Sequence, residues 1–234
     1  LVPTQGATRY HADISAALDL IQRGGMSLIA NPEGGSLDLA VLPTFGTRWL
    51  APRLPGFMAR HPGILVNLTT RFQPVAFATE PFDAAIIYRP DADADPNSLK
   101  LFDESLTACA SPAFLKAHPI DDPGDLAGLV LLHLQTRPQA WADWFRGQGR
   151  GAAPSGGMVM DQFSMMIQAA ISGLGVALLP DYLARQEIAE GHLLPVLRPA
   201  VPGRGGYCLV WPGSRTGSRP LVHFRNWLAA QVAG

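Results

Sequence analysis

The sequence predicts an α/β fold with two lobes, and three observations lead to this prediction. Short, continuously apolar runs alternate with segments of helical period, as expected for parallel strands that are covered by helices on both faces. Of the 234 residues, 47% are hydrophobic and 16% are charged, so the chain can bury a sizeable core and is not expected to be disordered. The alternation occurs in two series, and a final strand and helix are left over, which suggests that the chain returns to the first lobe.

An amphipathic helix is expected before the first series. Its apolar residues recur with helical spacing, and Gly24-Gly25 is expected to end it. These apolar residues are Tyr10, Ile14, Ala17, Leu18 and Ile21. Residues 30–35 have the turn composition of a linker, so we interpret the helix as a lead-in to the fold and not as part of its core.

The first series contains three expected strands with their helices. The strands cover residues 36–43, 64–70 and 82–88, with a helix over 45–60 and a helical turn over 74–80. Residues 89–98 follow as a segment rich in aspartate and proline. Its spaced aspartates resemble calcium ligands, but the glycine and the distal glutamate of an EF-hand loop are missing. We therefore interpret this segment as an exposed loop.

The second series follows one or two strands within 99–110. Ser111-Pro112 and Asp122-Pro123 have the residues of helix starts. Strands are then expected at 129–134, 157–160, 175–179 and 192–197, with helices near 138–146, 162–172 and 180–189. The last strand is expected at 207–211, and the last helix carries Leu221, Phe224 and Leu228 in register.

Composition and charge argue against several classes of protein. With 18 Lys and Arg against 19 Asp and Glu, the formal charge of −1 predicts no strong attraction to nucleic acid or to an anionic membrane. No apolar stretch reaches the roughly 18 residues that span a bilayer, and the first residues of the sequence do not show the charged region followed by an apolar region that is typical of a secretion signal. The two cysteines, Cys109 and Cys208, form no disulfide framework, so we expect a cytoplasmic protein. Because the chain begins at Leu1 and not at a methionine, we expect its natural start to lie upstream.

No local motif predicts catalysis or metal binding. The six histidines have no H-x-x-x-H or H-E-x-x-H spacing, and neither cysteine has a neighbouring partner, so we expect no metal. Gly173-Leu174-Gly175 runs from helix to strand, the reverse of a dinucleotide-binding turn. A phosphate-loop lysine and a nucleophile elbow are both missing. We therefore expect neither enzyme activity nor a cofactor.

Two helix starts remain as candidate ligand contacts. Thr44 follows the strand at 36–43, and Asp161 and Gln162 occupy the start of the helix at 162–172. Free N–H groups at such helix starts carry partial positive charge and bind small anions in α/β folds. The same residues can also serve only as caps of their own helices, and the residues alone leave both roles open.

Several short motifs occur in a specific order along nearly the whole chain. They are Leu-Pro-Thr-Phe-Gly-Thr-Arg-Trp-Leu-Ala-Pro-Arg-Leu at 42–54, Phe82-Asp83-Ala84-Ala85-Ile86, Cys109-Ala110-Ser111-Pro112, Leu131-Leu132-His133, Gln168-Ala169-Ala170, Gly-Leu-Gly-Val-Ala-Leu-Leu-Pro at 173–180 and Gly191-His192-Leu193. Together they resemble the effector-binding domain of LysR-type transcriptional regulators, most closely the glycine-cleavage-activator and β-lactamase-regulator subgroup.

The resemblance implies two Rossmann-like lobes of the type 2 periplasmic-binding-protein kind, with a cleft between them and two chain crossings. It divides the chain into the end of a linker helix and a linker (1–35), lobe I (36–108 and 209–234) and lobe II (109–208). The crossings are expected near Cys109–Ser111 and Tyr207–Cys208, which would bring the two cysteines close together. The resemblance also implies a homodimer, or a tetramer in the full-length protein. DNA would be bound only through a winged helix-turn-helix domain that precedes the linker helix.

By motif position, the resemblance places the effector site at Thr44, Tyr88, His133, Gln162, Phe163 and Tyr207. The chain departs from the family at Ile86-Ile87-Tyr88-Arg89-Pro90, where relatives usually have Ile-Arg-x-Gly, so the effector does not follow from relatives. Other roles stay open for two of these residues. His133 can be a structural hydrogen-bonding histidine, and Phe163 also belongs to the apolar core stripe of its helix.

The predicted function is that of a non-enzymatic sensor, in which a small polar or anionic effector binds in the cleft and controls an absent DNA-binding domain. The first alternative is a solute-binding protein of a transport system, which the upstream helix and the missing secretion signal oppose. The second is a small two-lobed lyase or transferase, which would need catalytic groups in the cleft.

Overall fold

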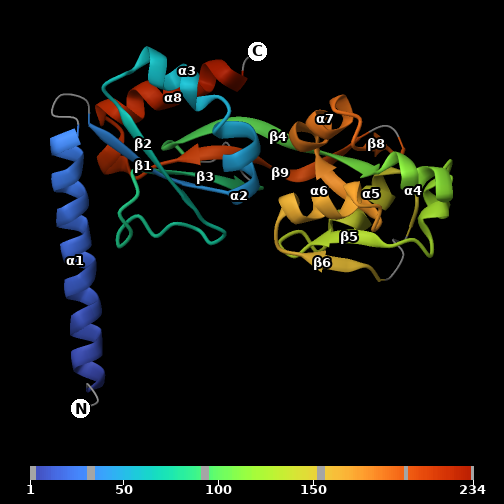
Figure 1. Cartoon of the computed structure of the whole chain (residues 1–234), viewed down its shortest axis with the longest axis horizontal. Helices are drawn as coiled ribbons and strands as arrows, with labels where there is room; N and C mark the ends of the chain where they lie inside the picture. The colour runs from blue at the N-terminus through green and yellow to red at the C-terminus, as the bar shows by residue number, and fades with distance from the viewer. Residues whose placement is uncertain (1–3, 31–34, 91–94, 152–155, 198–199, 233–234) are drawn as a thin grey trace.

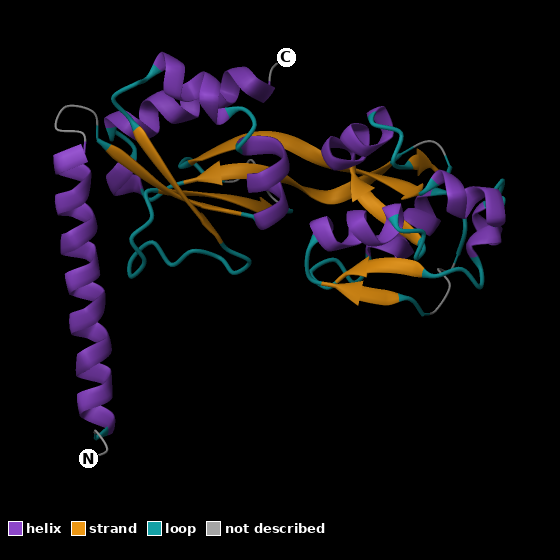
Figure 2. Ribbon diagram, viewed as in Figure 1, coloured by secondary structure: helices purple, strands orange, loops and turns teal. Residues whose placement is uncertain are grey.

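A nine-stranded sheet runs through both halves of the molecule in the computed structural model, which describes residues 4–30, 35–90, 95–151, 156–197 and 200–232 (Figure 1). The strand order is β2-β1-β3-β9-β4-β7-β5-β6, and β8 pairs separately with β4. Residues 31–34 of the expected linker and residues 91–94 of the expected aspartate-rich loop lie outside the described residues. Helices cover the sheet at both of its ends (Figure 2).

The first lobe contains the parallel strands β1, β2 and β3, which lie at one end of the sheet. Its elements are β1 (Ser36–Val41), α2 (Pro43–Phe45), a turn of π-helix η1 (Gly46–Leu50), α3 (Leu54–Arg60), β2 (Leu65–Thr70), β3 (Ala84–Arg89), the short turn η3 (Gly213–Arg215) and α8 (Arg219–Val232). The core of this lobe contains Phe57 and Phe224, whose rings meet edge to face at 5.4 Å between centroids. The last helix therefore packs beside the first strands.

The second lobe lies at the other end of the sheet, where β5 pairs in parallel with β6 and β7. Its elements are α4 (Pro112–Ala117), η2 (Pro123–Leu126), β5 (Leu131–Leu134), α5 (Ala140–Gly147), β6 (Met158–Met160), α6 (Phe163–Ile171), β7 (Val176–Pro180), α7 (Asp181–Ala189) and β8 (Leu194–Pro195). Its core has two parts: one surrounds Trp144, and the other packs Met166 and Ile167 of α6 against the sheet.

Two long antiparallel strands, β4 (Ser98–Ala110) and β9 (Val201–Val210), join the lobes. The two expected crossings are therefore present and lie side by side. The strand pairing is irregular between Asp103 and Ser105, at the level where the core contacts of β4 change from the first lobe to the second.

The prediction that the two cysteines lie close together is wrong. Cys208 pairs with Lys100 in the sheet, whereas Cys109 lies nine residues further along β4 and pairs with Ala177 and Pro195. The two residues are therefore about 30 Å apart along the strand. Both are buried free thiols. The reason is that each crossing is a long strand, and the two cysteines occupy opposite ends of the crossing pair.

Two predicted helices differ from the observed ones. The first helix, α1 (Gln5–Ala30), continues through Gly24-Gly25 instead of ending there, because a glycine inside a helix costs only about 1 kcal/mol. The helix expected over 45–60 is divided into α2, η1 and α3, and prolines at 52 and 55 remove the backbone donors that a continuous helix would need.

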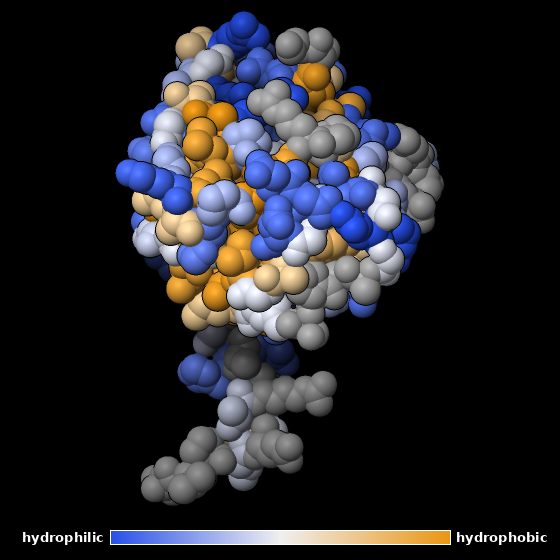
Figure 3. Space-filling view, turned by 90° about the vertical axis from the view of Figure 1, so that its right-hand side faces the viewer, coloured by the Kyte–Doolittle hydropathy of each residue, from blue (hydrophilic) through white to orange (hydrophobic). Residues whose placement is uncertain are grey.

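Exposed apolar side chains remain on α1 and on the second lobe. The helix α1 extends away from the rest of the protein, and Tyr10, Ile14, Leu18 and Ile21 are all exposed (Figure 1). Exposed large apolar residues of the second lobe are Val130, Met158, Val159, Met165, Leu174 and Leu194. Figure 3, which looks at this end of the molecule, shows apolar residues gathered on one side of it. No helix in the described part of the chain is long and apolar enough to span a membrane.

Candidate functional site

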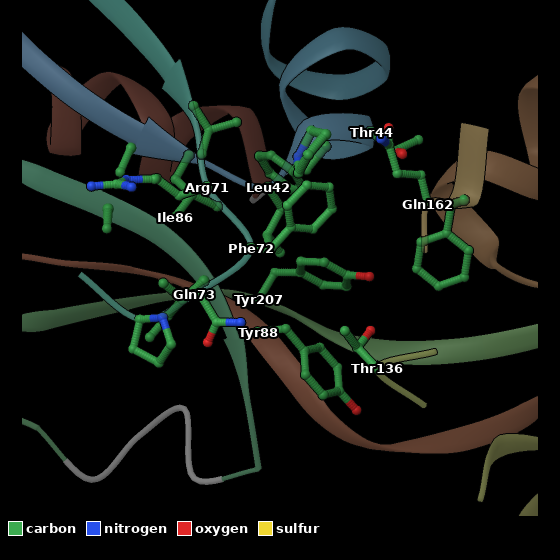
Figure 4. A pocket seen from close by; sticks show the side chains of 18 of the residues that line it. Leu42, Thr44, Arg71, Phe72, Gln73, Ile86, Tyr88, Thr136, Gln162 and Tyr207 are labelled. Carbon is green, nitrogen blue, oxygen red and sulfur yellow. The ribbon is translucent and has the colours of Figure 1, made fainter. Parts of the chain in front are cut away.

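A cavity of about 350 Å³ lies between the two lobes (Figure 4). The first lobe contributes the ends of β1 and β3, the start of α2 and the loop from Arg71 to Val75. The second lobe contributes Leu134, Thr136 and Arg137 after β5, the start of α6, and Tyr182 of α7. Tyr207 comes from the crossing strand β9.

The topology explains why these residues meet. In each lobe the lining residues follow the carboxyl ends of parallel strands, and in open α/β sheets that edge is where ligands bind. Five of the six residues expected at the effector site line this cavity: Thr44, Tyr88, Gln162, Phe163 and Tyr207.

His133 does not line the cavity. It belongs to β5, where neighbouring residues point to opposite faces, and its neighbour Leu134 reaches the cavity instead. The Nε2 atom of His133 lies 3.1 Å from the carbonyl oxygen of Gly156. His133 therefore has a hydrogen-bonding partner in the segment that leads into β6, and it is separated from the five residues that line the cavity.

Thr44 bridges the two lobes directly. Its hydroxyl oxygen accepts a hydrogen bond from the backbone N–H of Ser164, at 3.2 Å, and the residue is buried. Ser164 is the second residue of α6, whose N-cap Gln162 makes no side-chain cap of its own. Thr44 therefore caps a helix of the opposite lobe. The expectation that Thr44 could cap its own helix is wrong, because that helix begins at Pro43 with Leu42 as its N-cap.

A buried charged group lies where the strands cross, beside the cavity. The side chain of Glu104 is 1% exposed, and its Oε1 accepts hydrogen bonds from the Tyr207 hydroxyl at 3.0 Å and from Arg137 at 3.4 Å. The Arg137 guanidinium lies 3.3 Å from the ring centroid of Tyr88, a cation–π contact across the cavity wall. Burial, reinforced by Glu104, raises the pKa of Tyr88 to about 12. Burial likewise raises the pKa of Tyr207 and of Tyr182, so all three phenols are protonated at neutral pH.

Two arginine donors on the cavity wall have no partner among the described residues. They are the Nε atoms of Arg89 and Arg137, and both atoms are buried. Each of these arginines is ion-paired through another nitrogen, Arg137 with Glu104 and Arg89 with Asp95 at 3.8 Å. A third cavity arginine, Arg71, is ion-paired with Glu80. The rest of the wall is largely apolar and includes Phe72, Val75, Ile86 and Phe163. Such a cavity can hold a ligand that offers acceptor oxygens at one side and an apolar body at the other.

Three of the residues that build this site were not expected from the sequence. Glu104 is a charged residue inside an apolar strand, and that contrast was a usable signal. Arg137 and Tyr182 carry no such signal, because their contacts with Tyr88 and Tyr207 join positions far apart in the chain.

Comparison with known proteins gives consistent matches over most of the chain. A family model described as the LysR substrate binding domain matches residues 30–233. The uncharacterized HTH-type transcriptional regulator y4mQ of Sinorhizobium fredii is 32% identical over 212 residues, covering 89% of this chain and 70% of that protein. The glycine cleavage system transcriptional activator of Escherichia coli K12 is 29% identical, covering 100% and 77% respectively. The solved effector domain of AmpR of Pseudomonas aeruginosa is 32% identical with a TM-score of 0.75, covering 85% of this chain and 96% of that one.

Proposed function

Because this chain belongs to the LysR substrate binding domain family and is the effector-binding domain of a LysR-type transcriptional regulator, we propose that its inter-lobe cavity binds a small anionic effector. The expected two-lobed, type 2 periplasmic-binding-protein-like fold is confirmed by the solved effector domains that it matches. The transport alternative is not favoured, because the relatives are transcriptional regulators. The family consists of regulators and not of enzymes, which argues equally against a lyase or transferase.

The observation that carries this proposal is the pair of buried Nε–H donors of Arg89 and Arg137, which have no hydrogen-bond partner in the part of the chain that the structure describes. A buried donor that lacks an acceptor costs free energy, and a carboxylate supplies that acceptor together with an opposite charge. The apolar wall around Phe72, Ile86 and Phe163 favours an aliphatic or aromatic body on the same ligand. We therefore favour an organic carboxylate over a sugar or an inorganic anion.

The contacts of the effector are proposed on five of the residues named from the sequence. Gln162 is the N-cap of α6, and Thr44 of α2 reaches the same helix start from the other lobe (Figure 4). The N–H groups of a helix start favour an acceptor on the ligand. Tyr88 and Tyr207 line the side of the cavity beside Arg137, and Phe163 contributes apolar surface. His133 is left out of the proposed contacts because it lies outside the cavity.

Signalling is proposed to occur through the contacts that join the lobes. An effector oxygen at the start of α6 competes with the Thr44 hydroxyl for the Ser164 N–H. A second contact, the ion pair between Arg48 of η1 and Glu187 of α7 at 3.0 Å, also crosses between lobes. A ligand that exchanges such contacts changes the relative stability of the lobe arrangements, which is the free-energy basis of a population shift.

The assembly is proposed to be a homodimer, or a tetramer for the full-length regulator. The exposed apolar residues of α1 recur on one helical stripe, and a second copy of the helix would bury them. DNA contacts are assigned to a domain outside this chain, in keeping with a formal charge of −1. We place the regulator in the cytoplasm.

A thermal-shift screen tests the proposed effector class. Organic carboxylates and the amides of the same skeletons would be added to the protein, since a ligand at 100 times its Kd stabilises the folded state by about 2.7 kcal/mol. We expect the carboxylates to raise Tm and the amides to have little effect. For a binding carboxylate, Arg89→Met should weaken affinity by about tenfold or more, and the control Arg60→Met, at an exposed site on α3, should not. Equal binding of amides, or equal affinities in both variants, would refute the proposal.

A further inference from the structure

Three metal-binding side chains meet at the C-terminal end of α7, outside the effector cavity. Glu187, Glu190 and His192 each bring one ligand atom to within 4.8 Å of the others. Within the described residues, they form the one such group of three histidine, cysteine or acidic side chains. The proposed effector function uses none of these ligand atoms.

The backbone of the helix end brings these residues together. Glu187 lies in the last turn of α7, and Glu190, three residues later, is the C-cap of that helix with helical backbone angles, so the two side chains lie on one face. Gly191 follows with a φ of +75°, a left-handed conformation that glycine adopts without strain. The chain then turns back, and the N–H of His192 donates to the carbonyl oxygen of Glu187 at 2.9 Å. This turn places the His192 ring beside both carboxylates.

The two distances from the His192 ring to the carboxylates fit tetrahedral coordination. The Nδ1 atom of His192 lies 3.1 Å from Oε2 of Glu187 and 3.2 Å from Oε2 of Glu190. Around a tetrahedral zinc ion, whose bonds to nitrogen and oxygen are about 2.0–2.2 Å long, neighbouring ligand atoms are about 3.3 Å apart. Both distances therefore lie near the spacing that one ion would impose, and the ligand atoms of the two glutamates lie within 4.8 Å of each other.

The surroundings orient one ligand and leave access to the others. The Glu187 side chain is 3% exposed, and Arg48 of the first lobe holds its Oε1 at 3.0 Å, so Oε2 remains free to face His192. Hydrogen bonding of a ligating carboxylate through its second oxygen is the usual way in which proteins fix metal ligands. The side chains of His192 and Glu190 are about half-exposed, which lets an ion enter. The carbonyl groups at the end of α7 add partial negative charge.

We propose that Glu187, Glu190 and His192 bind a divalent transition-metal ion of the zinc type, with water at the remaining position. An imidazole with two carboxylates suits zinc, cobalt or nickel, whereas magnesium and calcium favour ligand sets made only of oxygen. The ion would hold the carboxylate that Arg48 contacts from the other lobe, so the site shares Glu187 with an inter-lobe ion pair.

Calorimetric titration with ZnCl₂ and visible spectroscopy with CoCl₂ test the site in the protein as it exists. We expect one ion per chain and the absorption bands of tetrahedral Co²⁺. Each of the substitutions His192→Gln and Glu190→Gln should weaken binding by about tenfold or more. Because both side chains are half-exposed, the variants should keep the wild-type Tm, which shows that they are folded.

The matched control is His223→Gln, because His223 and His61 form a close pair of histidines in the first lobe, with ring centroids 4.5 Å apart, and neither belongs to the proposed site. This variant should bind the ion as wild type does. The proposal is overturned if no saturable binding occurs up to about 1 mM Zn²⁺, if His192→Gln binds as tightly as wild type, or if His223→Gln removes the binding.

Discussion

Thr44→Val tests the inter-lobe helix cap. The substitution keeps the size and branching of the side chain but removes the hydroxyl that accepts the Ser164 N–H at 3.2 Å. Because α6 has no other side-chain cap and Thr44 is buried, the N–H of Ser164 would lose its partner. Loss of an N-cap costs about 0.5–2 kcal/mol. We therefore expect the free energy of unfolding to fall by about 1 kcal/mol, and Tm by about 2–4 °C for a chain of this size.

Urea denaturation of wild type, Thr44→Val and the control Thr47→Val provides the measurement. Thr47 is exposed and donates its hydroxyl only to carbonyl groups of its own helical segment, at 3.2 and 3.3 Å, so its replacement should change stability by less than about 0.5 kcal/mol. Equal stability of Thr44→Val and wild type, or equal losses in the two variants, would refute the reasoning. Thr44→Val is also expected to alter effector affinity, because ligand and hydroxyl share the start of α6.

Three further predictions concern packing and ionisation. Gly175→Ala should lower the free energy of unfolding by about 2–3 kcal/mol, because the added Cβ would lie 2.2 Å from the carbonyl oxygen of Val130. The control Gly56→Ala should not destabilise the protein, because its added Cβ meets nothing within 4 Å. Chemical denaturation compares the two variants. Burial raises the pKa of the Cys109 thiol to about 12, so a thiol reagent at pH 8 should modify Cys109 only as fast as the protein unfolds. Mass spectrometry locates the modified cysteine, and rapid modification of Cys109 in the folded protein would contradict this prediction. Burial raises the pKa values of Tyr88 and Cys109 to about 12 in the folded state, from ordinary values of 10 and 9, so unfolding releases protons above pH 9. Stability should therefore fall as the pH rises from 9 to 12, and a flat stability profile over that range would be inconsistent with burial of these groups.

The parts of the fold that local patterns encode could be predicted. Apolar runs and helical spacing predicted the two α/β series, and the rule that ligands bind at strand ends placed Thr44 and Gln162 together. The predicted and observed elements differ where tertiary packing overrides a local signal. Gly24-Gly25 does not end α1, and β9 begins at Val201, before the strand that was expected from Tyr207.

The parts of the site that depend on long-range pairing could not be predicted. Glu104 meets Tyr207 and Arg137 only because the two crossing strands pair and the second lobe folds against them. The cysteine prediction failed for the same reason: the number of residues in each crossing strand, and not the position of a crossing, decides how far apart its ends lie. The cluster at the end of α7 has no histidine or cysteine spacing that would predict it, because two of its three members are glutamates and the turn at Gly191 brings the histidine to them.

The most direct test of the account is a crystal structure of this chain with the carboxylate that gives the largest thermal shift. The account predicts that the ligand lies in the inter-lobe cavity, with carboxylate oxygens about 2.7–3.2 Å from the Nε atom of Arg89 or Arg137 and its apolar body against Phe72 and Phe163. It also predicts contact with the start of α6, where the Thr44 hydroxyl now binds the Ser164 N–H. A ligand bound outside this cavity, or bound within it with its carboxylate away from both arginines, would contradict the central claim.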